Sequence, residues 1–216
     1  MNRCAGTRAW WIALVVLGAP SVPAQAGEAA CHPALPDDRS RAQAGYTASF
    51  DAYKIPELTL LDQSGRKRDL PTLLSGDEDT IVSFVFTTCT TICPVMTSTL
   101  AAVQRESEEA GGTLRLVSIS IDPEHDRPQV LARYAARFRA GGDWLFLTGE
   151  ERGIRTVLRA FDADFGDKMN HRPLYFLRRS GAERWLRVEG LARGSDIARE
   201  LQALSAEATA PAREVP

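Results

Sequence analysis

Short apolar runs alternate with amphipathic stretches along most of the chain. Residues 80–86 and 114–121 are rich in β-formers and almost wholly apolar, which is typical of strands buried on both faces of a sheet. Between them, apolar residues recur at helical spacing from Pro94 up to Gly111-Gly112. A strand, a helix and a second strand in this order predict a parallel βαβ unit.

The pattern continues with two more helices and three more strands. An antiparallel hairpin comes near the end, and a closing helix follows it. This βαβ-then-ββα order predicts a thioredoxin-like α/β fold, a mixed central sheet flanked by helices. The predicted helices lie at about 128–138, 150–161 and 195–204, and the strands at 144–147, 174–178 and 185–188.

Outside this core, the sequence predicts one further hairpin and two irregular ends. Apolar and charged runs flank the turn cluster at 62–65, which favours an N-terminal β-hairpin over 57–70. Residues 27–49 have no apolar period and are interpreted as a flexible lead-in. We therefore expect a folded domain over 50–206 and a disordered tail over 207–216.

The first 26 residues have the layout of a secretory signal peptide. Arg3 and Arg8 come before a short apolar run, and the segment ends in the small-residue sequence Ala24-Gln25-Ala26. The run is shorter than the roughly 20 residues that cross a bilayer. We expect cleavage near Ala26 and a periplasmic protein without stable membrane insertion. The alternative is a leader that is retained as an anchor.

The charge and the cysteine content of the chain limit the classes of function that it can have. The formal net charge is −2, and removal of the leader would make the chain more acidic, which argues against nucleic acid as a partner. Cys4 would leave with the leader, so Cys31, Cys89 and Cys93 would remain. An odd number of cysteines in an exported protein indicates that at least one thiol is kept for chemistry.

The most informative motif is Cys89-Thr-Thr-Ile-Cys93-Pro94, which joins the strand at 80–86 to a helix. Cysteines four residues apart in a helical turn can be bridged, with Cα atoms about 6 Å apart. The helix N-terminus is expected to stabilise a thiolate at Cys93. His171 opens the strand at 174–178, which should lie next to the cysteine-bearing strand.

Two thiols and an imidazole allow more than one chemistry. Thiolates suit Cu(I), and a nitrogen ligand lets a site also hold Cu(II), so Cys89, Cys93 and His171 are candidate copper ligands. Cys89 and Cys93 are also a candidate redox pair for thiol–disulfide exchange. An inert disulfide with a surface histidine is the remaining alternative.

Several segments together make the chain resemble the Sco-type (SenC) family of thioredoxin-fold copper chaperones for cytochrome c oxidase assembly. The resemblance covers roughly residues 50–205. It rests on the strand and CxxxCP loop at 84–96, the SISIDPEHDRP segment at 118–128, WLFLTG at 144–149, and His171 with the strand that follows it.

The resemblance implies a metallochaperone rather than an enzyme. Copper, as Cu(I) or Cu(II), would be bound by Cys89, Cys93 and His171. The protein would deliver it to the copper centre of a respiratory cytochrome c oxidase or reduce the cysteines of that centre. The implied partner is the copper-centre subunit or another periplasmic copper or thiol protein. The alternative is a thioredoxin-like thiol–disulfide oxidoreductase that uses the same cysteine pair without copper. Asn170 stands where relatives often carry aspartate.

Overall fold

The chain divides into the units Met1–Cys31 and His32–Pro216, and a computed structural model describes residues 36–209 of the second. The predicted signal peptide, Cys31 and most of the predicted tail lie outside the described residues. The described elements are α1 (Asp38–Gln43), β1 (Tyr46–Asp51), β2 (Thr59–Asp62), β3 (Lys67–Asp69), α2 (Leu70–Leu74), β4 (Asp79–Val85), α3 (Ile92–Glu109), β5 (Leu114–Ser120), α4 (Pro128–Arg137), β6 (Trp144–Thr148), α5 (Glu151–Ala160), the 3₁₀ turn η1 (Lys168–Asn170), β7 (Leu174–Arg178), β8 (Trp185–Gly190) and α6 (Gly194–Thr209).

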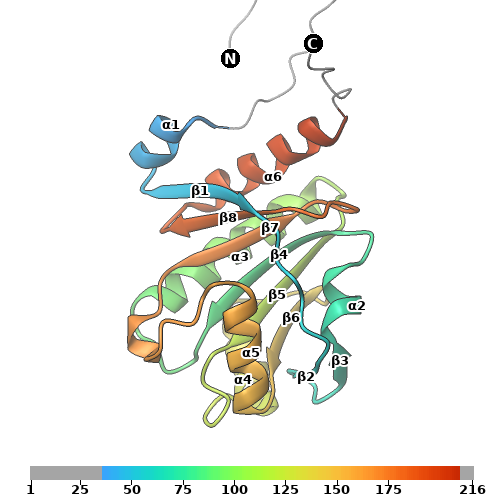
Figure 1. The fold of residues 1–216 in the computed structure, drawn as a ribbon, viewed down its shortest axis with the longest axis vertical. Coiled ribbons are helices and arrows are strands. Elements are labelled where there is room, and N and C mark those ends of the chain that lie inside the picture. The colour runs from blue at the N-terminus through green and yellow to red at the C-terminus, as the bar shows by residue number, and fades with distance from the viewer. Residues whose placement is uncertain (1–35, 210–216) are drawn as a thin grey trace, which may run out of the picture. The chain divides into compact units, whose positions relative to one another are not determined.

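One mixed sheet of eight strands organises these elements, in the order β1-β8-β7-β4-β5-β6-β2-β3 (Figure 1). Strand β4 pairs in parallel with β5 and antiparallel with β7. The predicted βαβ unit, both hairpins and the neighbouring position of the strand after His171 are therefore confirmed. Because β4 is central, the loop that leaves its carboxyl end carries the cysteines to one edge of the sheet.

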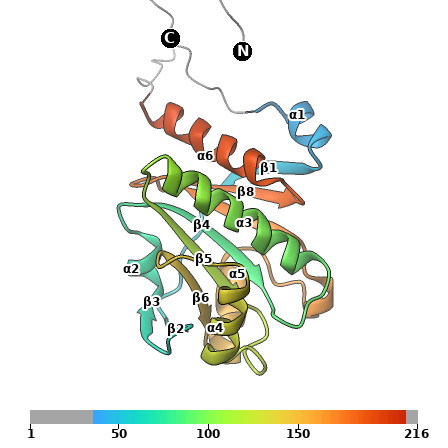
Figure 2. The ribbon, with the colours of Figure 1, turned by 180° about the vertical axis from the view of Figure 1, so that it is seen from behind.

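Helices cover both faces of this sheet. Ile81 and Val82, adjacent on β4, pack into different apolar clusters, as expected from the two-residue period of a strand. Helices α3, α4 and α6 contribute to the cluster that contains Ile81, and Figure 2 shows α3 and α6 in front of the sheet. Helices α2 and α5 contribute to the other cluster. The α/β prediction with flanking helices is confirmed.

The prediction of a flexible lead-in over 27–49 is wrong for residues 38–49. These residues form α1 and most of β1, and β1 pairs along its whole length with β8. Helix α6 also continues to Thr209, past the predicted start of the tail. The folded region therefore extends further at both ends than the apolar pattern indicated.

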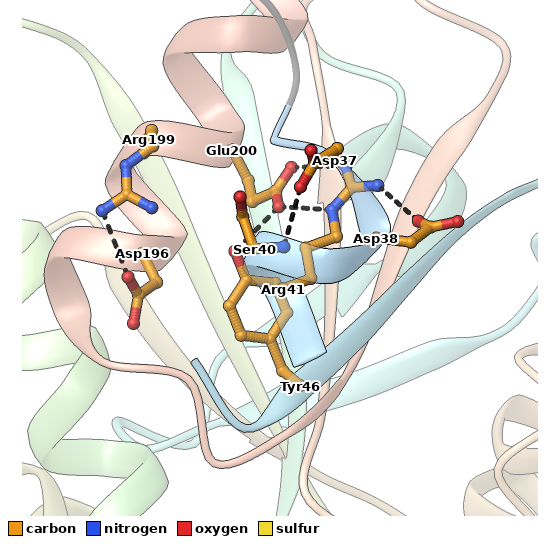
Figure 3. Close-up of polar contacts among 8 residues, drawn as sticks. All are labelled: Asp37, Asp38, Ser40, Arg41, Tyr46, Asp196, Arg199 and Glu200. Carbon is orange, nitrogen blue, oxygen red and sulfur yellow. Dashed lines mark hydrogen bonds and ion pairs between the residues drawn. The ribbon is translucent and has the colours of Figure 1, made fainter. Parts of the chain in front are cut away.

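A buried ionic cluster explains why the lead-in is ordered (Figure 3). The guanidinium of Arg41 on α1 donates to both carboxylate oxygens of Glu200 on α6, at 2.8 and 2.9 Å. The Tyr46 hydroxyl donates to Glu200 as well, at 2.9 Å. These polar contacts add to the pairing of β1 with β8 and to the apolar packing of Tyr46, and a search for apolar periodicity cannot detect them. None of the described helices is both long and apolar enough to cross a membrane.

Candidate metal and redox site

The cysteine motif forms the turn between β4 and α3. Helix α3 begins at Ile92, so Pro94 occupies its third position rather than the predicted first one. Proline is tolerated there because the first N–H groups of a helix have no partner within the helix. Cys89 is half-buried in the preceding loop, while Cys93 lies in the first helical turn and is fully buried.

The Cys89 sulfur acts as a hydrogen-bond acceptor for the helix N-terminus. Thr91, at the N-cap, makes no capping bond with its side chain, and the backbone N–H of Cys93 donates instead to Cys89 Sγ at 3.4 Å. Burial alone would raise the pKa of Cys89. Hydrogen bonds from the backbone of Cys93 and Thr91 outweigh it, so the pKa of Cys89 lies below its ordinary value.

The predicted thiolate at Cys93 is wrong, because the helix N-terminus stabilises Cys89 instead. Burial raises the pKa of the Cys93 thiol far above its ordinary value, and the neighbouring Cys89 sulfur adds to the rise. Both cysteines are free thiols in this structure. The pair therefore consists of a reactive outer thiol and an inner thiol that stays protonated until a metal ion or a disulfide replaces its proton.

This asymmetry predicts selective alkylation of the metal-free protein. In the Cys93→Ser variant, Cys89 should react with iodoacetamide faster than a free cysteine at neutral pH. As the pH is raised, this rate should reach its plateau at a lower pH than it does for a free thiol, whose pKa is about 8.5. In Cys89→Ser, Cys93 should react many times more slowly. Rates from mass spectrometry that are equal, or faster for Cys93, would contradict the assignment.

His171 reaches the cysteines from the turn that precedes β7. Asp167 caps η1 by accepting from the backbone N–H of Met169, and the His171 N–H closes the turn on the Lys168 carbonyl at 3.2 Å. The imidazole Nδ1 then lies 3.9 Å from Cys93 Sγ. The ring also packs against the edge of Phe86, with centroids 6.2 Å apart.

The spacing and the protonation of the ring suit a metal ion. Sulfur and imidazole ligands sit roughly 2.0–2.3 Å from a first-row ion, which separates two ligands of one ion by about 3.3–4 Å. The 3.9 Å between Cys93 Sγ and His171 Nδ1 falls in this range. Burial lowers the pKa of His171, which favours the neutral ring that binds metals.

The other ring nitrogen of His171 faces the protein. Nε2 is buried and makes no hydrogen bond of normal geometry within the described residues. The nearby backbone of Phe84 nevertheless raises the pKa of the ring, against the lowering by burial. A metal-bound histidine usually donates this N–H to a carbonyl or carboxylate. The Phe84 carbonyl on β4 is the group available here, since Asn170 stands where relatives often have an aspartate.

Two of the three candidate ligands line a hollow rather than a closed cage. Cys89 and His171 line a cavity of about 280 Å³, and the buried Cys93 contacts His171. Among residues 36–209, no group of three His, Cys, Asp or Glu side chains is packed closely enough to hold an ion as it stands. A bound ion would therefore draw Cys89 and His171 closer together.

Two acidic residues from the segment at the end of β5 support the site. Asp126, fully buried, accepts from the backbone N–H of Thr87 at 3.0 Å and from Ser120 at 2.7 Å, which ties the cysteine loop to the end of β5. Asp122 pairs with Lys168 of η1 at 2.7 Å and so holds the histidine turn against the segment that follows β5. Both lie in the SISIDPEHDRP segment, whose aspartates were the only signal in the sequence.

Two further side chains close to these loops in sequence, those of His125 and Arg172, do not take part in the site. The side chain of His125 is exposed in the loop between β5 and α4. Arg172, which follows His171, donates to Glu189 at 3.0 Å and lies over the ring of Phe165. Its guanidinium is therefore engaged by groups other than the cysteines.

The fold and the thiol pair together define a thioredoxin-like dithiol protein with a histidine against the inner thiol. Residues 47–204 match SCO1/SenC, so the chain belongs to the SCO1/SenC family. It is 36% identical over 98 residues to the SCO1 protein homolog of Bacillus subtilis, 45% of this chain and 50% of that one. The chain thus spans about half the length of that relative.

Two further comparisons agree with this family. A protein from Stutzerimonas stutzeri that is named as copper-binding is 30% identical over 141 residues, 65% of this chain and 67% of that one. The solved structure of BsSco, which is named as a member of the Sco family of cytochrome c oxidase assembly proteins with a disulfide switch, superimposes with a TM-score of 0.60 at 28% identity. The superposition covers 74% of this chain and 96% of BsSco.

Proposed function

We propose that the protein is an exported copper metallochaperone. Cys89, Cys93 and His171 bind one copper ion, and the protein delivers it to the copper centre of a respiratory cytochrome c oxidase or reduces the cysteines of that centre. The site of action outside the cytoplasm and the identity of the partner are parts of this proposal.

The observation that carries the proposal is the 3.9 Å contact between Cys93 Sγ and His171 Nδ1 at the wall of the cavity that Cys89 lines. A dithiol that only exchanges disulfides does not need an imidazole against its inner sulfur. Two thiolates and a neutral imidazole suit both Cu(I) and Cu(II). The copper-binding relative and the Sco family membership support the same reading.

Copper affinity in the His171→Ala variant tests the proposal. The wild-type protein should bind one Cu(II) with a sulfur-to-copper charge-transfer band. His171→Ala should lose most of this band and bind Cu(II) at least 10- to 100-fold more weakly, since replacing only a hydrogen-bond partner of a metal ligand already costs about this much. Cu(I) binding should fall less, because thiolates are its preferred ligands.

His125→Ala is the matched control, because it removes an exposed imidazole that lies outside the site. Its copper binding should equal that of the wild type. If His171→Ala binds Cu(II) as tightly as His125→Ala does, the imidazole is not a ligand and the metallochaperone proposal loses its main support.

The asymmetric thiols favour thiol–disulfide exchange as a second candidate function. The low pKa of Cys89 makes it the attacking thiol, and the buried Cys93 would resolve the mixed disulfide. Reduction of a protein disulfide at an unchanged rate in His171→Ala, by protein that retains no copper, would favour this function over copper transfer.

A further inference from the structure

A thioether stands at the outer wall of the site cavity. Met169 lines the cavity of about 280 Å³ together with Cys89 and His171. Its side chain is 75% exposed, more than any other large apolar side chain in the described part of the chain. Met96, by contrast, is fully buried in the core. Packing therefore explains Met96 and does not explain Met169.

The backbone of Met169 is fixed next to a proposed copper ligand. Its N–H donates to Asp167 at 2.9 Å, and the same turn is held by the Lys168–Asp122 ion pair at 2.7 Å. His171 closes this turn, so the backbones of Met169 and His171 are held next to each other. The side chain of methionine has several freely rotating bonds, which allow its sulfur to swing over the cavity.

The chemistry of the cavity favours a soft metal ion at this sulfur. A thioether is a ligand for Cu(I) and a poor one for Cu(II), and it carries no proton that must be displaced. Lys168, the other long side chain on this wall, is a cation held by Asp122 and is not a ligand. A neutral, exposed ligand can also release copper without being reprotonated.

We propose that the Met169 thioether is an additional, exchangeable ligand for Cu(I) at the cavity of Cys89 and His171. This inference rests on the proposed copper function. Met169 acts on the reduced ion alone, where it completes the coordination from the solvent side and gives way when another protein's ligand approaches.

X-ray absorption at the selenium edge tests this contact directly. In selenomethionine-labelled protein loaded with Cu(I), copper should appear as a neighbour of selenium, and the signal should vanish in Met169→Leu. In competition titrations, Met169→Leu should weaken Cu(I) binding about tenfold, as much as the loss of a hydrogen-bond partner of a metal ligand, and leave Cu(II) binding unchanged. Val95→Leu, at an exposed apolar position outside the cavity lining, is the control.

The outcomes separate this inference from the proposed function. If the labelled protein binds Cu(I) through Cys89, as judged by its loss in Cys89→Ser, but shows no copper near selenium, Met169 is not a ligand and the copper function stands. A copper–selenium signal that persists in Met169→Leu also overturns the inference. If the wild type binds no copper at all, both proposals fail.

Discussion

Replacing Cys93 with serine is expected to weaken Cu(I) binding roughly 100- to 1,000-fold. Four-ligand zinc sites gain about 10–16 kcal/mol in total, so one strong ligand contributes roughly 2.5–4 kcal/mol, and about 1.4 kcal/mol corresponds to a tenfold change in affinity. Cys93 is fully buried beside His171. A serine hydroxyl in its place keeps the volume similar but cannot supply a soft anionic donor.

The pH dependence of binding should change in the same variant. Copper displaces the proton of each thiol that is still protonated. Between the lowered pKa of Cys89 and the raised pKa of Cys93, only the Cys93 proton is displaced, so wild-type affinity should rise about tenfold per pH unit across this window. Below the Cys89 pKa, two protons are displaced and the slope should double. In Cys93→Ser, affinity should be flat above the Cys89 pKa.

Cu(I) competition titrations at several pH values through neutral check both expectations. Ser98→Ala, at an exposed position on the same helix, should behave as the wild type. Affinity in Cys93→Ser within tenfold of the wild type, with an unchanged pH slope, would show that the inner thiol is not a ligand.

The core of the fold could be predicted because its pattern is local and strong. Strands such as 80–86 are buried on both faces and are almost wholly apolar, and the helices that cover them have a clear period. The handedness of parallel crossovers then restricts the topology to few choices. Element type and order are therefore predictable even where boundaries shift by one or two residues.

The residues of the site could be predicted from the sequence, but which of its two thiols has the lower pKa could not. The sequence shows the spacing of Cys89 and Cys93 on a strand-to-helix turn. It also shows His171 just before a neighbouring strand. Which thiol receives the free N–H groups depends on where the helix begins, and a shift of two residues transferred that role from Cys93 to Cys89. The hydrogen bond from Thr87 to Asp126 joins segments 39 residues apart and has no local signature.

The N-terminal segment shows a different limit of sequence reasoning. Its composition resembles that of a disordered lead-in, yet Arg41 and Tyr46 meet Glu200 more than 150 residues away. Long-range polar contacts of this kind leave no periodic trace, so only the folded structure identifies them. Their contribution to the free energy of unfolding can be measured directly.

Arg41→Met is expected to lower the free energy of unfolding by about 3–5 kcal/mol, the cost of leaving one partner of a buried ion pair uncompensated. Glu200 is fully buried, and Arg41 supplies two of its hydrogen bonds, at 2.8 and 2.9 Å. After the substitution, Glu200 would keep only the donor Tyr46 from this cluster. Methionine retains the aliphatic stem of arginine, so the loss reports mainly on charge. Urea denaturation measures it.

Two further variants separate the ion pair from other effects of the substitution. Arg39→Met changes an exposed arginine on the same helix and should alter stability by less than about 0.5 kcal/mol. Arg41→Met combined with Glu200→Leu should recover most of the loss, because replacing both partners of a buried pair with apolar residues is close to neutral. If Arg41→Met is instead as stable as Arg39→Met, the pair does not hold α1 against α6. The order of residues 38–49 would then have to come from the pairing of β1 with β8 alone.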